Sequence, residues 1–440
     1  MLPLPAELWH KIFACYEQDS PTLALVCLVC KDFNSLAQPL VFRKVTLYNL
    51  LAYGSGEVAL CGRNGILLGS YVNEMEVEVV MEVEAMDRSD TWHPMETQMA
   101  RKKAEVQCKK AFAILDVCTE IKALTWRLEC HRFYNPEKPH YLYPEDFYGT
   151  LPTLSATDLL SLPCLDKLRS LNIVFTNGPR VYNAQAFGEV IVAATQLETV
   201  RLEGVDEPTL FEPLLARFAS DPAFTHALAT LSVDTDLGIS ETSWMWQATA
   251  ELSILTNVVI VAEQVLDFTD FPEDMPWPVS NLVTHLSLSV TRDFTWEEDL
   301  KEVARLFPCL QTFTLDGPHS TIRSESQAEF VRTSLFPTPH DNISIFTLKL
   351  AIDEPDFSRL CDDLTILWHL HDAKTLPALR SYRLVVSSAQ DLSCWVINNF
   401  RLVADECASD APEFIHLYIA LRTSTTQDAL VEVEKSASGR

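Results

Sequence analysis

One short pattern of hydrophobic positions, apolar-x-x-apolar-x-apolar, recurs along the chain. It occurs twelve times, starting at Phe42, Val72, Ile121, Leu168, Leu197, Leu228, Leu255, Val283, Leu310, Ile343, Leu379 and Phe414. The alternation over its last three positions is typical of a strand with one buried face. From Leu168 to Leu310 the copies are 29, 31, 27, 28 and 27 residues apart. Three apolar residues recur by chance, but six successive copies at near-constant spacing do not, so we predict a repeated strand.

The segments between these strands have the spacing of helices. Apolar residues fall at i, i+3, i+4 and i+7 in residues 108–115, 187–194, 211–218 and 300–307. That spacing places them on one face of an α-helix. Strand and helix therefore alternate, which predicts an α/β chain whose strands are parallel.

A period near 28 residues with this strand pattern resembles the leucine-rich repeat. The asparagine usual in longer repeats of that family is absent, so the array is degenerate. The resemblance implies a right-handed βα solenoid with irregular repeats of about 27–36 residues, strands on the concave face and helices on the convex face. We expect the solenoid at 41–422, with insertions near 80–110 and 130–165, followed by a frayed tail at 423–440.

The first 40 residues have a different, helical pattern. Leu8, Ile12 and Phe13 lie on one side of a helix, and Ser20-Pro21 is a typical helix start. A second apolar stripe, running through one continuous helix, is predicted at Leu25, Leu28, Val29, Phe33 and Leu36. About 40 residues bury only a small core, so we expect this part to rely on a partner.

This N-terminal segment resembles the F-box of fungal type. The resemblance lies in Leu4-Pro5-Ala6-Glu7-Leu8, Ile12-Phe13, Leu28-Val29-Cys30-Lys31-Asp32-Phe33 and Leu36-Ala37, with Phe33 where tryptophan is usual. It implies an all-α F-box at 1–40 that docks on the Skp-type adaptor of an SCF cullin–RING ubiquitin ligase, with the solenoid as the receptor for a protein substrate. The adaptor contacts that it implies are Leu4, Pro5, Leu8, Ile12, Phe13, Leu28, Val29, Cys30 and Phe33.

Charge and composition narrow the class of partner. Of 440 residues, 34 are Lys or Arg and 61 are Asp or Glu, a net charge of −27. A chain this acidic is a poor ligand for nucleic acid or for an anionic membrane. No apolar run reaches the roughly 18 residues of a membrane span, and the start of the chain lacks the pattern of a signal peptide. The twelve cysteines are scattered, so we expect reduced thiols in the cytoplasm or nucleus.

The repeat pattern also predicts which side chains face a ligand. The third, fifth and seventh positions of each copy point away from the core. The substrate-binding candidates among them are Glu74, Glu76, Glu78, Arg201, Glu203, Asp234, His285, Asp316, Lys349, Arg383 and Tyr418. The three glutamates on one strand favour a basic ligand. The alternative for each residue is a solvated sheet face without a ligand.

No catalytic pattern emerges from the sequence. Cys27 and Cys30 have no second pair or nearby histidine, and Cys361, His369 and His371 lack a tetrahedral ligand signature. No phosphate-binding glycine loop or hydrolase motif occurs. We therefore expect no enzyme activity, no cofactor and no metal. The alternative to a ligase subunit is a repeat-protein scaffold that binds a partner without ubiquitin transfer.

Overall fold

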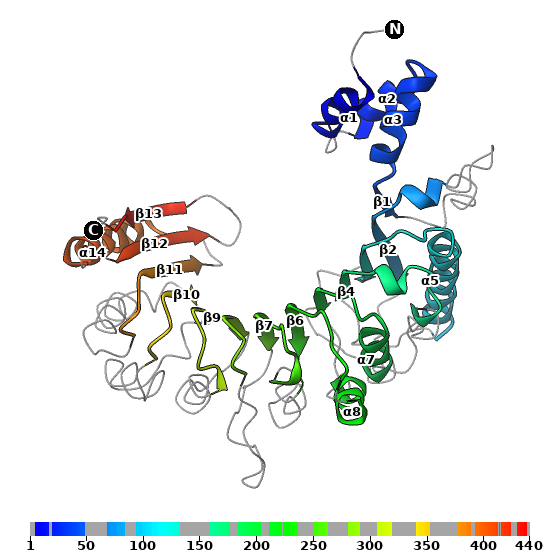
Figure 1. Cartoon of the computed structure of the whole chain (residues 1–440). Coiled ribbons are helices and arrows are strands. Elements are labelled where there is room, and N and C mark those ends of the chain that lie inside the picture. The colour runs from blue at the N-terminus through cyan, green and yellow to red at the C-terminus, as the bar shows by residue number, and fades with distance from the viewer. Residues whose placement is uncertain are drawn as a thin grey trace. The chain divides into compact units, whose positions relative to one another are not determined.

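The structure is a computed structural model of the whole chain (Figure 1). The residues that it describes are 5–16, 20–48, 68–83, 94–132, 159–176, 184–203, 211–221, 223–235, 248, 250–262, 280–290, 306–318, 340–352, 376–388, 392–411, 413, 415–423 and 429–437. The chain has a mixed α/β fold with a long, mostly parallel sheet. It forms two compact units, Met1–Val205 with His226–Leu228, and Asp206–Thr225 with Ala229–Arg440.

The first unit begins with three helices, α1 (Ala6–Ala14), α2 (Ser20–Cys27) and α3 (Lys31–Val41). Their core contains Phe13, Leu23, Ala37 and Leu40, all buried. Trp9, Phe13 and Phe33 add an aromatic cluster with ring centroids 4.8–5.7 Å apart. Aromatic pairs in this range attract each other beyond their burial. We call residues 5–41 the helical module.

The prediction of a single helix across residues 20–36 is wrong, because residues 28–30 are not helical and separate α2 from α3. Cys30 has an extended backbone (φ −160°, ψ 169°), and its Sγ accepts the N–H of Phe33 at 3.4 Å. Cys30 is therefore the N-cap of α3. The break places Leu28 and Val29 in a turn between two helices, not on a shared helical stripe.

Five parallel strands follow in the first unit: β1 (Lys44–Leu47), β2 (Glu74–Val83), β3 (Ala123–Arg132), β4 (Ser170–Thr176) and β5 (Thr199–Glu203). Each pairs with the next in chain order. The described helical segments between them are η1 (Leu68–Tyr71), α5 (Pro94–Leu115), η3 (Leu165–Lys167) and α7 (Ala184–Ala193). Two of the predicted helices, 108–115 and 187–194, are confirmed as parts of α5 and, to within one residue, α7.

The second unit contains the strands β6 (Thr230–Thr235), β7 (Asn257–Ala262), β8 (His285–Val290), β9 (Thr312–Pro318), β10 (Ile345–Ile352), β11 (Ser381–Ser388), β12 (His416–Thr423) and β13 (Ala429–Lys435). Strands β6 to β12 are parallel neighbours in chain order. Its longer described helices are α8 (Glu212–Ser220), which matches the predicted 211–218, and α14 (Cys394–Asp410). The predicted helix 300–307 lies almost entirely outside the described residues.

The register of the strands is fixed by a repeated backbone contact. The carbonyl of Thr256, just before β7, accepts the N–H groups of Thr284 and His285 at 2.9 and 3.0 Å. In the first unit the carbonyl of Asn73 accepts those of Lys122 and Ala123 at 2.7 and 3.0 Å. Because this contact holds each strand start beside the next, equivalent repeat positions line up across each unit.

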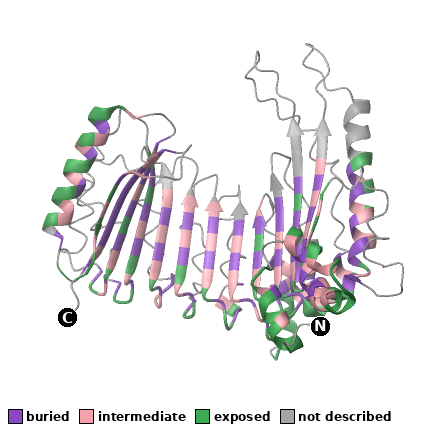
Figure 2. Cartoon of the chain, turned by 90° about the horizontal axis from the view of Figure 1, so that it is seen from above, coloured by how far each residue is buried: buried purple, intermediate pink, exposed green. Residues whose placement is uncertain are grey.

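All twelve predicted strands are confirmed as β1 to β12. Along most of them burial alternates as the pattern predicts, for example intermediate, buried, exposed, buried, intermediate in β5. Figure 2 shows this alternation as bands along the strands. In β12, however, all residues from Leu417 to Leu421 are buried. In each unit the buried side chains form the core, and the opposite side of the strands, here called the polar face, carries the third, fifth and seventh positions.

The frayed tail expected at 423–440 is wrong for residues 429–435. These form β13, which is antiparallel to β12, with Val431 opposite Leu421 and Val433 opposite Ile419. Val431 is buried, and α14 packs on β13. The alternation of valine and glutamate in this segment is a strand pattern, so the signal was present in the sequence.

Candidate protein-binding surfaces

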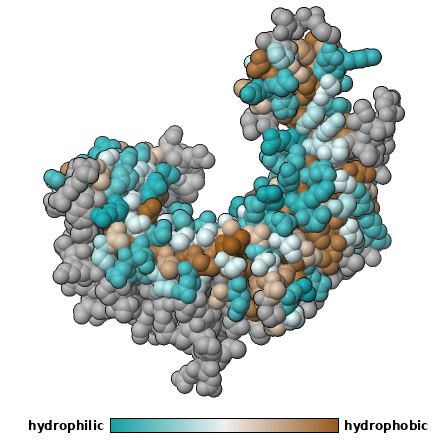
Figure 3. Space-filling view, viewed as in Figure 1, coloured by the Kyte–Doolittle hydropathy of each residue, from teal (hydrophilic) through white to brown (hydrophobic). Residues whose placement is uncertain are grey.

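The helical module presents apolar side chains to solvent. Leu25, Leu28 and Val29 are 65%, 81% and 66% exposed, and Leu8 and Ile12 are also exposed. In Figure 3 hydrophobic atoms of this module reach the molecular surface. Single exposed apolar residues are ordinary, but five in a module of about 40 residues form an unusually apolar surface.

The predicted adaptor residues separate into two sets. Pro5, Leu8, Ile12, Leu28, Val29 and Cys30 are exposed. Phe13 is buried and Phe33 is half-buried, and both pack in the aromatic cluster with Trp9. These two residues therefore shape the module from inside. Leu4 lies outside the described residues.

Of the three cysteines of the module, Cys27 and Cys30 have clear structural environments. Burial raises the pKa of the Cys27 thiol, which disfavours the thiolate form, and Cys30 caps α3. Within the described part of the chain, no group of three or more His, Cys, Asp or Glu side chains could hold a metal ion. Cys361, His369 and His371 lie outside that part.

On the polar face of the first unit, opposite charges are paired. Glu74, Glu76 and Glu78 occupy alternate positions of β2, but Glu76 Oε1 lies 2.8 Å from Arg127 Nε on β3. Arg201 is ion-paired with Glu203 on β5. The acidic strip predicted on β2 is thus partly neutralised by its neighbour strand.

The polar face of the second unit is mostly uncharged from β6 to β9. The register aligns Ser232, Val259, Ser287 and Thr314 across four strands. His285 is exposed, with its Nδ1 2.8 Å from Thr284 Oγ1, and Asp316 Oδ2 lies 3.6 Å from Lys349 Nζ. Asp234 is in β6, but its side chain lies outside the description.

At the last strands of this face, a tyrosine lies between two arginines. The guanidinium carbon of Arg383 is 5.1 Å from the ring centroid of Tyr418, and Arg422 Nη2 donates to the Tyr418 hydroxyl oxygen at 3.0 Å. Tyr418, predicted on an open surface, is only 7% exposed. Arg422 was not predicted, although the alternation that selects residues 416, 418 and 420 extends to it.

Comparisons with known proteins add no relative. No protein-family model matches the chain, and no curated protein matches its sequence. Among the described helices, none combines the length and apolarity needed to cross a bilayer.

Proposed function

We propose that this chain is the substrate-recognition subunit of an SCF-type cullin–RING ubiquitin ligase in the cytoplasm or nucleus. The helical module acts as an F-box that docks on the Skp-type adaptor, and residues 41–422 form a leucine-rich-repeat-like solenoid of right-handed βα units that binds a protein substrate. The chain itself supplies proximity and orientation, and the conjugating enzyme bound to the RING subunit performs ubiquitin transfer.

The observation that carries the proposal is the exposed apolar surface of the helical module. A module this small has buried Phe13, Leu23 and Leu40, yet leaves Leu25, Leu28 and Val29 in water. Burial of exposed leucine and valine side chains in an interface stabilises a complex by about 1.5–3 kcal/mol each. This surface suits a protein partner with a matching apolar groove.

The proposal of a solenoid rests on period and register. Repeats near 28 residues, parallel strands in chain order and a shared carbonyl contact between successive strand starts within each unit are what stacked βα units require. Such an array leaves one broad face of side chains open along the strands. That face suits a protein ligand better than a small molecule.

A pull-down with purified Skp-type adaptor tests the docking half. We expect the wild-type chain to bind and Leu28→Ser with Val29→Ser to reduce binding at least tenfold, since contacts at an interface centre cost about 2 kcal/mol each when removed. Trp395→Ser with Leu402→Ser is a matched control, because these two residues of α14 are also 67% exposed but lie in the second unit. Equal retention of the wild type and the Leu28/Val29 variant would contradict the docking proposal.

The second candidate function is a scaffold without ligase activity. The same polar faces would then hold a partner, and the helical module would bind the adaptor in a complex without cullin, or nothing at all. Co-purification of cullin with the chain, together with faster turnover of the captured partner, distinguishes the ligase subunit from the scaffold.

A further inference from the structure

The arginines at the last two parallel strands differ from those elsewhere on the polar faces. Arg127 and Arg201 in the first unit are each bonded to a carboxylate. Arg383 and Arg422 form no ion pair within the described residues, in a chain whose net charge is −27. Two unneutralised guanidinium groups beside one tyrosine are therefore an exception that needs a physical reason.

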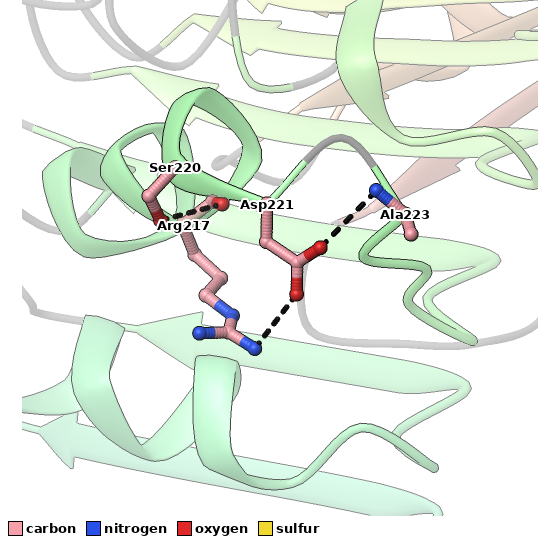
Figure 4. Close-up of polar contacts among 4 residues, drawn as sticks. All are labelled: Arg217, Ser220, Asp221 and Ala223. Atoms are coloured by element: carbon pink, nitrogen blue, oxygen red, sulfur yellow. Dashed lines mark hydrogen bonds and ion pairs between the residues drawn. The ribbon is translucent and has the colours of Figure 1, made fainter.

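Arg217, in the same unit, is an arginine that contacts both an aromatic ring and a carboxylate. Its guanidinium carbon lies 5.2 Å from the ring centroid of Phe224, nearly the distance between Arg383 and Tyr418. However, Arg217 Nη2 also lies 3.0 Å from Asp221 Oδ2 (Figure 4). The other carboxylate oxygen of Asp221, Oδ1, accepts the N–H of Ala223. The cation–aromatic contact is thus common to both sites, but the carboxylate is present only at Arg217.

The cluster of Arg383, Tyr418 and Arg422 offers hydrogen-bond donors. The Tyr418 oxygen already accepts from Arg422, so the phenolic hydrogen is free to donate. Arg422 Nε is shielded from solvent and has no hydrogen-bond partner. A buried donor without a partner costs about 1–3 kcal/mol. The guanidinium of Arg422 is therefore incompletely satisfied by the described residues of the chain.

Two carboxylates of this chain lie on the same face of the neighbouring strand. Glu434 is opposite Tyr418, but its Oε1 is 2.8 Å from His416 Nε2. Glu432 is opposite Ala420 and exposed, without an ion pair to either arginine. Both lower the positive potential of the cluster, but neither occupies it.

We propose that the cluster binds a carboxylate side chain of an acidic protein segment. A carboxylate has two oxygens that accept a guanidinium fork in parallel, and it leaves lone pairs for the phenolic hydroxyl. A single negative charge also suits a chain of net charge −27 better than a doubly charged phosphate, which is repelled about twice as strongly. The carboxylate site depends on the proposed function in one respect, which is that the polar face binds a protein ligand.

Retention of the purified full-length chain on immobilised degenerate peptides tests the inference. The peptides are dodecamers with Glu, Gln or phosphoserine fixed at the centre. We expect the Glu peptides to retain about tenfold more wild-type chain than the Gln peptides, as the loss of a charged hydrogen bond implies. Arg383→Gln with Arg422→Gln should abolish that preference, and Glu432→Gln should increase it.

Arg217→Gln is the matched control, because it removes one arginine from an aromatic ring outside the cluster and should leave the preference unchanged. Thermal unfolding of each variant shows whether the fold is kept. If Arg422→Gln unfolds, Arg422→Lys replaces it, since lysine keeps the charge without the fork. Equal retention on Glu and Gln peptides, a preference confined to phosphoserine, or a double variant that behaves as wild type would each overturn the proposal.

The adaptor is absent from this experiment. Failure of the wild type in the adaptor pull-down therefore contradicts the ligase assignment alone, and loss of the Glu preference contradicts the carboxylate site alone.

Discussion

His226 Nε2 lies 2.8 Å from the carbonyl oxygen of Ile191, which is part of α7. The other ring nitrogen, Nδ1, accepts the N–H of Leu228 at 3.1 Å. The accepting Nδ1 carries no proton, so Nε2 must donate, and the imidazole is neutral. A buried neutral histidine thus joins the end of a helix to the start of the next repeat.

This relationship predicts a pH dependence of stability. Burial lowers the pKa of His226 from its ordinary 6.5, although the bond to Ile191 opposes the shift. In the unfolded chain His226 takes up a proton near pH 6.5, whereas in the folded chain it stays neutral to a lower pH. His226 therefore contributes to the stability of the fold above pH 6.5, and this contribution is lost as the pH falls through the lowered pKa. We expect His226→Gln to reduce the loss of unfolding free energy between pH 7.5 and 5.5, measured by urea denaturation.

His10→Gln is the control for that measurement, because His10 is an exposed histidine of the helical module. If His226→Gln kept the full pH dependence of the wild type, the buried neutral imidazole would not be its source.

The helical module predicts a sharp contrast within one helix. Leu23 is fully buried and Leu25 is 65% exposed, yet both belong to α2. We expect Leu23→Ala to destabilise the module by about 3 kcal/mol and Leu25→Ala by less than about 0.5 kcal/mol. Hydrogen exchange of the amides in residues 6–41 measures both, and similar exchange in the two variants would contradict the packing described.

Gly69 lies beside a backbone carbonyl, so replacing it with alanine should lower the free energy of unfolding instead of raising it. A Cβ added at Gly69 would lie 2.4 Å from the carbonyl oxygen of Val117. Alanine normally stabilises by reducing the freedom of the unfolded chain, but here the backbone must shift. We expect Gly69→Ala to destabilise by about 1–3 kcal/mol in thermal unfolding. A variant as stable as the wild type would show that the Val117 turn moves aside easily.

The pairing of β12 with β13 predicts that the stability of β12 depends on β13. Val431 is buried opposite Leu421, so Val431→Asp places a charge in the core and should cost about 3 kcal/mol or more. Glu432→Ser, on the exposed side of the same strand, should change stability by less than about 0.5 kcal/mol. Amide exchange at residues 417–421 reports the result. Unchanged protection in Val431→Asp would mean that β12 is stable without its partner.

The thiol of Cys164 provides a chemical test of burial. Burial raises the pKa of this thiol to about 11, whereas Cys394 is exposed at the start of α14. Because the thiolate is the reactive form, iodoacetamide at pH 8 should modify Cys394 and leave Cys164 intact in the folded chain. Mass spectrometry of the tryptic peptides shows which sites react, and early modification of Cys164 would contradict its burial.

The sequence pattern alone determined β1 to β12 of this protein, but not β13. Twelve strands and the side of each that faces the core follow from a local period of two, which the backbone imposes without long-range information. The helices at α5, α7 and α8 follow in the same way from a period near 3.6. The resemblance to a family motif selected the exposed Leu8, Ile12, Leu28 and Val29. It did not select Leu25, and hydrophobicity alone does not distinguish the exposed Leu25 from the buried Leu23.

The tertiary structure decided what local patterns leave open. The helix ends before Cys30 because the thiol of Cys30 caps a new helix, although the helical spacing of apolar residues continues through Leu28 and Val29. Tyr418 follows the exposed alternation of its strand but is buried between Arg383 and Arg422. The register of β11 and β12 places Arg383 beside Tyr418, and Arg422 reaches the Tyr418 hydroxyl from four residues further along β12. A period specifies which side of an element a residue occupies, but only the packed neighbours decide whether water reaches it.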